Sequence, residues 1–455
     1  MMTLDIPITF EERDEFSRKN IAEKVITLLK SDITVSPLVI DGSWGLGKTE
    51  FCIKLINLMS KQDTHHLIYI DAFKSDHADE PLLTVLAKVL EILPSEEKQK
   101  GFIQKAIPAL RYGLKTGGKA LISHVLRQDT DSIIEGFDEE VKQVADKAID
   151  SAVESLLRDH VDAEKNLKAL QQALMSVVEQ KPIVLFIDEL DRCRPDFSVL
   201  MLETIKHTFD VEGVQFVLVT NTNQLKASIN HCYGPTIDAQ RYLDKFIKFS
   251  FTLPHTYNEN RDNAIMVSVS HYKNLIAKSE LLKDLQLDRD SCFGLVEQVI
   301  NTNNVSLREV ETFVRHIEIY QILFNQQPLS NDTHWVYKLM RLLGILLVSL
   351  KPSLANAILL NVLDAKDLGS FMGVEKLPQV HGNQYPSHSD VLMFMLGSEC
   401  KYNSDWYLPA NTQDKKMWEE EVNEYFRGNH NLRMSSDHHI SIVTNAIKGL
   451  GLSAN

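Results

Sequence analysis

The chain has 455 residues, of which 44% are hydrophobic and 24% are charged, and its formal net charge at pH 7 is −14. This composition is typical of a globular protein with about two to four domains and excludes a disordered or collagen-like chain. The negative net charge argues against a general nucleic-acid binder, which carries a large basic surface. A local basic groove is still compatible with this charge. The five cysteines are scattered without the spacing of a zinc site, which indicates reduced thiols.

Two stretches invite comparison with targeting or membrane segments. Residues 3–30 carry too many charges for a secretory signal. The longest strongly apolar run, residues 342–350, is too short to span a bilayer as a helix. We therefore expect a cytoplasmic protein without a membrane span.

The first predicted elements are a strand, a glycine-rich loop and a helix in direct succession. Helical spacing over residues 21–29 precedes an apolar run at residues 37–40, which indicates a buried strand. Residues 42–49 read GSWGLGKT, which fits the phosphate-loop pattern G-x-x-x-x-G-K-[ST], and residues 50–59 continue as a helix. Backbone N–H groups of such a loop and of the following helix N-terminus bind phosphates.

The loop residues have expected roles toward a nucleoside triphosphate. Lys48 is expected to reach the β- and γ-phosphates and the Thr49 hydroxyl to ligate Mg²⁺. The predicted nucleotide-binding residues of this segment are Gly42, Ser43, Trp44, Gly45, Leu46, Gly47, Lys48, Thr49 and Glu50. Trp44 packs either on the shell that faces the nucleotide or in the core. The alternative for the whole motif is a glycine turn with a surface lysine.

Helical patterns dominate the region after the next strand. Residues 66–73 indicate that strand, and Pro81 stands at a first-turn position of a helix. From there to about residue 178 only helical spacing is found. Lys48 and the second motif at Asp188 lie 140 positions apart. A minimal core needs far fewer residues, so we expect a helical insertion of about 80 residues.

The second motif follows a strand predicted at residues 183–187. Five apolar residues in a row suit a parallel strand buried on both faces, and Asp188 and Glu189 follow at its carboxyl end, where open α/β sheets bind ligands. Asp188 is expected to hold Mg²⁺, and Glu189 to act as general base toward the attacking water. Acids at a strand end are otherwise solvated turn residues, but the phosphate loop in the same chain favours the catalytic interpretation.

The remaining patterns complete the predicted architecture. Residues 215–221 and 247–253 indicate two more strands, and helical spacing runs from residue 255 to about residue 324. The predicted class is α/β: a P-loop NTPase parallel-sheet core with a helical insertion, a helical lid and an α-rich C-terminal domain. The predicted boundaries are residues 1–84 and 179–255 for the core, 85–178 for the insertion, 256–325 for the lid, and 326–455 for a C-terminal domain of unknown role.

An ordered series of motifs resembles the KAP family of P-loop NTPases, a branch near the STAND and AAA+ ATPases. The resemblance covers residues 5–324. Besides the phosphate loop it rests on Phe16-Ser17-Arg18, Asp71-Ala72-Phe73, Ile187-Asp188-Glu189-Leu190-Asp191-Arg192-Cys193-Arg194-Pro195, Ala239-Gln240-Arg241-Tyr242-Leu243-Asp244-Lys245-Phe246-Ile247 and Ser306-Leu307-Arg308-Glu309-Val310-Glu311. Many members carry transmembrane helices between the two nucleotide motifs; this chain has an insertion there but no apolar span.

The resemblance implies roles for three further residues. Asn221, after the predicted strand at 215–221, is implied to contact the γ-phosphate or orient water, with a helix N-cap as the alternative. Arg241 is implied to complement transition-state charge, from its own or a neighbouring subunit, with a structural salt bridge as the alternative. Arg308 is implied to reach the phosphates from the lid. Arg192 is expected to be structural or to contact another subunit.

The sequence also favours one nucleotide over another. Guanine-specific GTPases read the base with Asn-Lys-x-Asp after a strand, whereas residues 221–224 read NTNQ, without the acid. We therefore expect ATP, with Mg²⁺. The resemblance implies an ATP-hydrolysing switch that gates a protein assembly in bacterial anti-phage defence, as a homo-oligomer with an effector protein partner. The alternatives are a nucleic-acid-stimulated ATPase motor or loader, against which the acidic net charge and the lack of a clear basic-aromatic stretch argue, and a scaffold whose nucleotide is structural.

Overall fold

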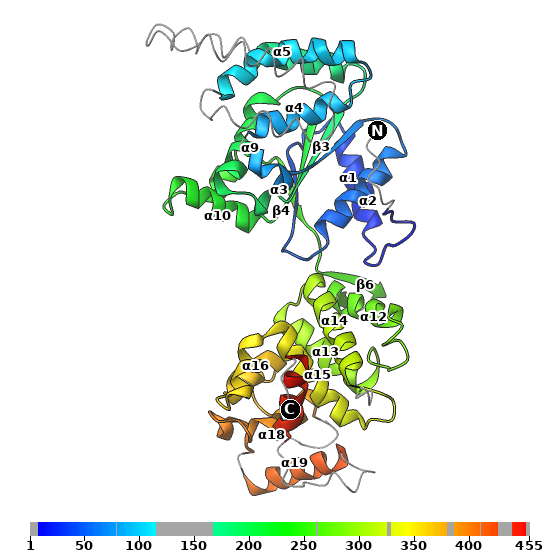
Figure 1. Cartoon of the computed structure of the whole chain (residues 1–455), viewed down its shortest axis with the longest axis vertical. Helices are drawn as coiled ribbons and strands as arrows, with labels where there is room; N and C mark the ends of the chain where they lie inside the picture. Colours follow the sequence, from blue (N-terminus) through cyan, green and yellow to red (C-terminus); the bar gives the residue numbers. More distant parts are fainter. Residues whose placement is uncertain are drawn as a thin grey trace. The chain divides into compact units, whose positions relative to one another are not determined.

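The chain divides into two compact units, Met1–Leu253 and Pro254–Asn455. The computed structural model describes residues 8–78, 80–114, 167–260, 263–324, 329–379, 386–409, 411–425 and 439–451 (Figure 1). Residues 115–166, the larger part of the predicted insertion, lie outside this description. The first unit contains the phosphate loop and both acids of the second motif, so it is described first.

A parallel sheet forms the centre of the first unit. Five strands of the described residues pair in the order β2-β3-β4-β1-β5. Their bounds are β1 Leu38–Asp41, β2 His66–Asp71, β3 Ile183–Asp188, β4 Val214–Thr220 and β5 Phe249–Thr252. The register aligns Asp41 with Thr220 and Asp71 with Asp188. Polar residues therefore gather along the carboxyl edge of the sheet, with β4 between the strands that lead into the two nucleotide motifs.

Helices cover both faces of this sheet, which explains why its strands are apolar. Every residue of β3 is buried, as expected for a strand covered on both sides. On one side of the strands lie α1 (Lys19–Leu29) and α2 (Lys48–Ser60) (Figure 1). On the other side lie α4 (Pro81–Glu91), α9 (Pro195–Thr208) and α10 (Thr222–Tyr233). The predicted α/β class is confirmed.

Shorter elements complete the first unit. Within the predicted insertion, α5 (Glu96–Leu114) and a helical stretch at residues 167–178 are described. The others are α3 Ala72–Ser75, η1 Asp76–Ala78, η2 Leu190–Arg192 and α11 Ala239–Leu243. The strand predicted over residues 66–73 was too long by two residues. It stops at Asp71 because that carboxylate accepts the backbone N–H of Lys74 at 3.0 Å and thereby starts α3.

In the described part of the second unit, helices predominate and β6 and β7 form a hairpin. Its elements are β6 Thr256–Asn260, β7 Asn263–Met266, α12 Val267–Lys278, α13 Asp290–Asn303, α14 Leu307–Leu323, α15 Trp335–Leu350, α16 Pro352–Leu359, α17 Ala365–Met372, α18 His388–Gly397, η3 Ser404–Tyr407, α19 Thr412–Tyr425 and α20 Ile440–Leu450. The prediction of a helical pattern from residue 255 onward was wrong for the hairpin. Thr256 pairs with Met266 and Tyr257 with Ile265 in an antiparallel ladder. Asparagines at residues 258, 260 and 263 favour turns over helix.

One hydrophobic core joins the helices predicted as a lid with those predicted as a separate C-terminal domain. The apolar run at residues 342–350 lies in α15, where Leu342 and Leu346 are fully buried in this core. A β-carbon at Gly344 would lie 2.9 Å from the backbone oxygen of Val443, so glycine lets α15 and α20 approach closely. Among the described residues, no helix is both long and apolar enough to cross a membrane.

Glu399 holds the start of α20 and makes the stability of the second unit depend on pH. Its carboxylate accepts the backbone N–H groups of His439 and Ile440, both at 2.9 Å, and lies 2.7 Å from Nδ1 of His439. Burial by itself raises the pKa of Glu399, but these hydrogen bonds outweigh it and lower that pKa below its ordinary value of 4.5. A lowered carboxyl pKa stabilises the fold above the unfolded value, and the stabilisation is lost as pH falls through the folded value.

Replacing Glu399 with glutamine should therefore destabilise the second unit at neutral pH. We expect a loss of about 2 kcal/mol at pH 7, because hydrogen bonds to a charged acceptor are replaced by weaker ones. The loss should shrink as the pH falls below 4.5. Calorimetric unfolding at pH 7 and pH 4 measures it, with the exposed Glu420→Gln as matched control. An equal loss at both pH values would contradict the assignment.

Candidate nucleotide-binding site

The glycine-rich loop joins β1 to α2 and turns sharply twice. Gly45 and Gly47 have φ angles of +74° and +79°, in the left-handed region that other residues rarely adopt. Gly47 directly precedes Lys48, the first residue of α2. At Gly42 a β-carbon would lie 2.9 Å from the side chain of Leu46. The glycines therefore allow the tight wrap in which loop N–H groups and the α2 N-terminus form an anion site.

Lys48 lies inside this loop. Its side chain is buried, with 9% of the residue exposed. Its ammonium donates hydrogen bonds to the backbone oxygens of Gly42 at 2.7 Å and Ser43 at 3.1 Å. Burial lowers the pKa of Lys48, and the charge of Asp191 is the largest effect that opposes this. The loop thus holds a poorly hydrated cation, which is suited to pair with phosphate oxygens.

Thr49 and Asp188, the two predicted metal ligands, are in contact. Asp188 ends β3 and is 1% exposed. Its carboxylate accepts hydrogen bonds from the backbone N–H of Glu189 at 2.8 Å and from the Tyr69 hydroxyl at 3.1 Å. The nearby Thr49 hydroxyl favours the charged form of this carboxylate and acts to lower its pKa. Burial raises the pKa of Asp188 to about 6. A nearby cation would favour its charged form, and carboxylate and hydroxyl oxygens are ligands of Mg²⁺. This donor set fits the ion.

Glu189, the predicted general base, stands directly after Asp188 in a left-handed backbone conformation with φ +59°. Residues other than glycine that adopt this conformation cluster at functional sites. Its carboxylate forms an ion pair with Arg192, with Nη1 and Oε2 2.8 Å apart. Arg192 therefore orients the predicted base, in keeping with the structural role expected for it.

The structure adds a connection that the sequence did not predict. Trp44, at the tip of the loop, is 48% exposed. Its indole N–H donates to Oδ2 of Asp191 at 2.6 Å. The other oxygen of Asp191 accepts the Thr220 hydroxyl at 3.3 Å. Asp191 thus ties the loop tip to the carboxyl end of β4. Trp44 is therefore held by a hydrogen bond at its indole N–H, and about half of the residue stays exposed instead of packing in the core.

A further unpredicted carboxylate, Asp41, lies beside the loop at the carboxyl end of β1, the strand between β4 and β5. It is the last residue of β1, directly before the loop. It accepts the backbone N–H of Thr222, at the start of α10, at 2.8 Å and the Thr252 hydroxyl at 3.4 Å. Asp41 directly precedes Gly42 and follows a predicted strand, and this position in the sequence could have identified it as a site residue.

The remaining predicted residues are placed differently. Asn221 is the N-cap of α10, and its side chain accepts the backbone N–H of Asn223 at 3.1 Å. Arg241 lies on α11 with 85% of its side chain exposed, paired with Asp238 at 3.2 Å. Arg308 lies in the second unit, exposed in the first turn of α14. None of these contacts involves the phosphate loop, so the roles implied for the three residues stay predictions.

The β1–loop–α2 unit, with Asp188 at the end of a neighbouring parallel strand, defines the class as a P-loop protein that binds nucleoside triphosphates. A family model described as the KAP family P-loop domain matches residues 18–324. Since this match covers more than half of the chain, the protein belongs to the KAP family of P-loop NTPases. A search of curated proteins found no match.

Proposed function

We propose that the protein is a Mg²⁺-dependent ATPase that works as a molecular switch. The observation that carries the proposal is the contact between Thr49 and Asp188, with Glu189 next in the chain and Lys48 buried in the loop. These four side chains supply the parts that phosphoryl transfer requires: a cation on the phosphates, ligands for the metal, and a base for the water.

Each of these residues has a separate role in the proposed hydrolysis. Lys48 exchanges its hydrogen bonds to Gly42 and Ser43 for phosphate oxygens and neutralises their charge. Thr49 and Asp188 hold Mg²⁺, which when bound neutralises charge that develops on the phosphates. Glu189, positioned by Arg192, accepts the proton of the attacking water.

ATP is the proposed nucleotide because the segment after β4 is unsuited to read guanine. Residues 221–224 lack the acid of a guanine-reading motif. In addition, Asn221 caps α10 by accepting a hydrogen bond from Asn223. Its amide oxygen is therefore already used within the fold.

The proposed switch gates a protein assembly, with the chain as a homo-oligomer and an effector protein as partner. Membership of the KAP family and the exposed guanidinium of Arg241 support this part of the proposal. An arginine that projects into solvent can reach a site on a neighbouring copy. We extend the proposal to bacterial anti-phage defence on the family resemblance.

Phosphate release by the purified chain tests the function directly. We expect turnover of ATP that requires Mg²⁺ and stops on chelation, slower turnover of GTP, and no increase on adding DNA or RNA. Stimulation by nucleic acid would instead indicate a motor or loader. ATP binding without turnover under any of these conditions would indicate a scaffold with structural nucleotide.

A further inference from the structure

A hydrogen bond, and not burial in the core, holds Trp44 at the tip of the phosphate loop. The residue is 48% exposed, and its indole N–H donates to Oδ2 of Asp191 at 2.6 Å. Hydrogen bonds to a charged carboxylate are shorter and stronger than those between neutral groups. Gly45, which follows Trp44, has a φ angle of +74°, so the backbone turns at this point. The turn thus has a directional anchor outside the loop.

Asp191, the acceptor, belongs to the segment that carries the predicted base. It lies in η2, two residues after Glu189 and one before Arg192, the ion-pair partner of that base. Asp191 is buried, and its Oδ1 accepts the hydroxyl of Thr220 at 3.3 Å. Thr220 is fully buried at the end of β4. The carboxylate is therefore fixed on the sheet, and Trp44 connects the loop tip to it.

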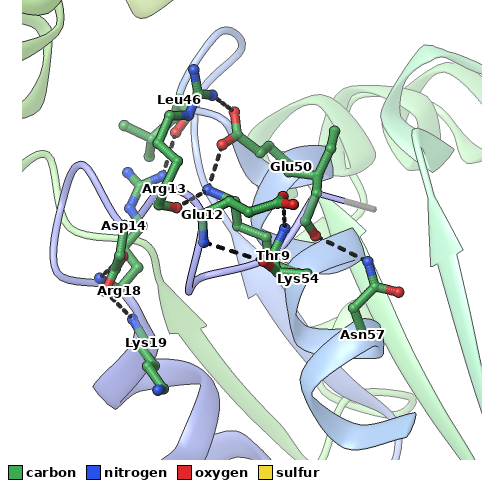
Figure 2. Close-up of polar contacts among 11 residues, drawn as sticks. Thr9, Glu12, Arg13, Asp14, Arg18, Lys19, Leu46, Glu50, Lys54 and Asn57 are labelled. Carbon is green, nitrogen blue, oxygen red and sulfur yellow. Dashed lines mark hydrogen bonds and ion pairs between the residues drawn. The ribbon is translucent and has the colours of Figure 1, made fainter. Parts of the chain in front are cut away.

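Other side chains also hold the loop, and phosphate binding changes some of these contacts. The Arg18 guanidinium donates from Nη1 to the backbone oxygen of Leu46 at 2.9 Å (Figure 2). The Lys48 ammonium donates to two backbone oxygens of the loop. In the proposed function, Lys48 exchanges these two oxygens for phosphate oxygens. Arg18 then still holds the end of the loop, and Trp44 still holds its tip.

The position of the loop tip matters because the loop and η2 hold different reacting groups. Loop N–H groups bind the phosphates. Arg192, the last residue of η2, orients Glu189. A misplacement of about 1 Å between reacting groups can lower a rate by about 100-fold. A connection between the loop tip and η2 limits such a shift without contacting the nucleotide.

We propose that Trp44 is a positioning residue for hydrolysis, which acts through Asp191 to align the phosphate loop with the segment that carries Glu189. The inference rests on the proposed function, because it assumes that phosphates occupy the loop and that Glu189 is the base. The phosphates themselves are held by Lys48, the loop N–H groups and the metal ligands. Loss of the indole N–H should therefore lower kcat and leave nucleotide affinity unchanged.

Turnover and binding by the full chain test this with Trp44→Phe, which keeps an aromatic ring and removes the N–H. Phosphate release gives kcat for ATP with Mg²⁺, and calorimetry gives the Kd of a non-hydrolysable ATP analogue. We expect kcat to fall about 10-fold, part of the loss that a full misplacement causes, with Kd unchanged. The matched control is Trp406→Phe in η3. Trp406 is 44% exposed and donates its indole N–H to the backbone oxygen of Glu375 at 2.9 Å. Its loss should change neither quantity.

A second variant tests the route through Asp191. Thr220→Val removes the other donor to this carboxylate and keeps the shape of the buried side chain, while the loop is unaltered. Its kcat should also fall. The double variant should be no slower than the slower single variant, since both substitutions break the same connection. Changes at sites that share no partner would add in free energy, so their fold losses would multiply.

The possible failures are distinct. Wild-type kcat in Trp44→Phe, weaker analogue binding by this variant, or losses that multiply in the double variant would overturn the inference while the ATPase proposal stands. If thermal denaturation shows Trp44→Phe to be unfolded, Thr220→Val decides alone: wild-type kcat overturns the inference, and lower kcat with unchanged Kd supports it. A wild-type chain that does not hydrolyse ATP overturns the proposed function, and this inference with it.

Discussion

Replacing Lys48 with alanine should remove nucleotide binding or lower ATP turnover by about 10²- to 10³-fold, the loss typical for a donor that stabilises transition-state charge. The Lys48 ammonium is the cation that the loop carbonyls of Gly42 and Ser43 hold in place. No other cation occupies that position among the contacts of the described residues. Phosphate release at saturating Mg²⁺ and ATP, together with analogue binding, measures the effect.

The matched control lies at the other end of the same helix. Lys61 is the C-cap of α2 and is exposed, where it pairs with Glu11 at 3.0 Å. Lys61→Ala should keep wild-type turnover, because it removes the same charge away from the loop. Thermal unfolding of both variants shows whether they are folded. Undiminished turnover in Lys48→Ala would mean that the phosphate site was assigned to the wrong loop.

Local chemistry explains which parts of the site could be predicted. The phosphate loop and the acids at residues 188–189 follow from short patterns, because loop glycines and strand-end acids act through neighbours in the chain. The Thr49–Asp188 contact follows in turn from the parallel sheet that these patterns predict. The fold class was predictable for the same reason: buried parallel strands are continuous apolar runs.

Long-range contacts and competing local signals explain the rest. Trp44 and Asp191 are 147 positions apart, and no pattern in either segment indicates that an indole N–H meets that carboxylate. Strand β2 ends two residues before its predicted end because the Asp71 side chain caps the following helix. A pattern of apolar residues does not reveal such a cap. The β6–β7 hairpin was missed because its few apolar residues also fit helical spacing.

The contact between Arg18 and the phosphate loop illustrates the same limit. The motif at residues 16–18 is recognised in the sequence only as part of a family resemblance. Its contact with the loop depends on a left-handed turn at Ser17 and on the reach of Arg18 to Leu46. Residue spacing predicts neither feature, so only the folded chain shows that this motif contacts the phosphate loop.

Replacing Glu189 with glutamine should lower ATP turnover by about 10²- to 10⁴-fold, the contribution of a positioned general base. Glutamine keeps the shape of the side chain but cannot accept the proton of the attacking water. Binding of ATP should persist, because Lys48, Thr49 and Asp188 are unchanged. Quenched-reaction analysis should therefore find intact ATP on the variant, whereas the wild-type chain should hold ADP.

The ion pair with Arg192 requires a control of its own, because the glutamine variant loses it as well. Arg192→Ala keeps the base but removes the group that orients it, so we expect a smaller loss of turnover than for Glu189→Gln. The exposed Glu212→Gln should have no effect. If Arg192→Ala lowers turnover as far as Glu189→Gln does, the pair acts as a unit and Glu189 need not be the proton acceptor. Wild-type turnover in Glu189→Gln would place the base elsewhere, while retained ATP without turnover would establish that this side chain separates binding from hydrolysis.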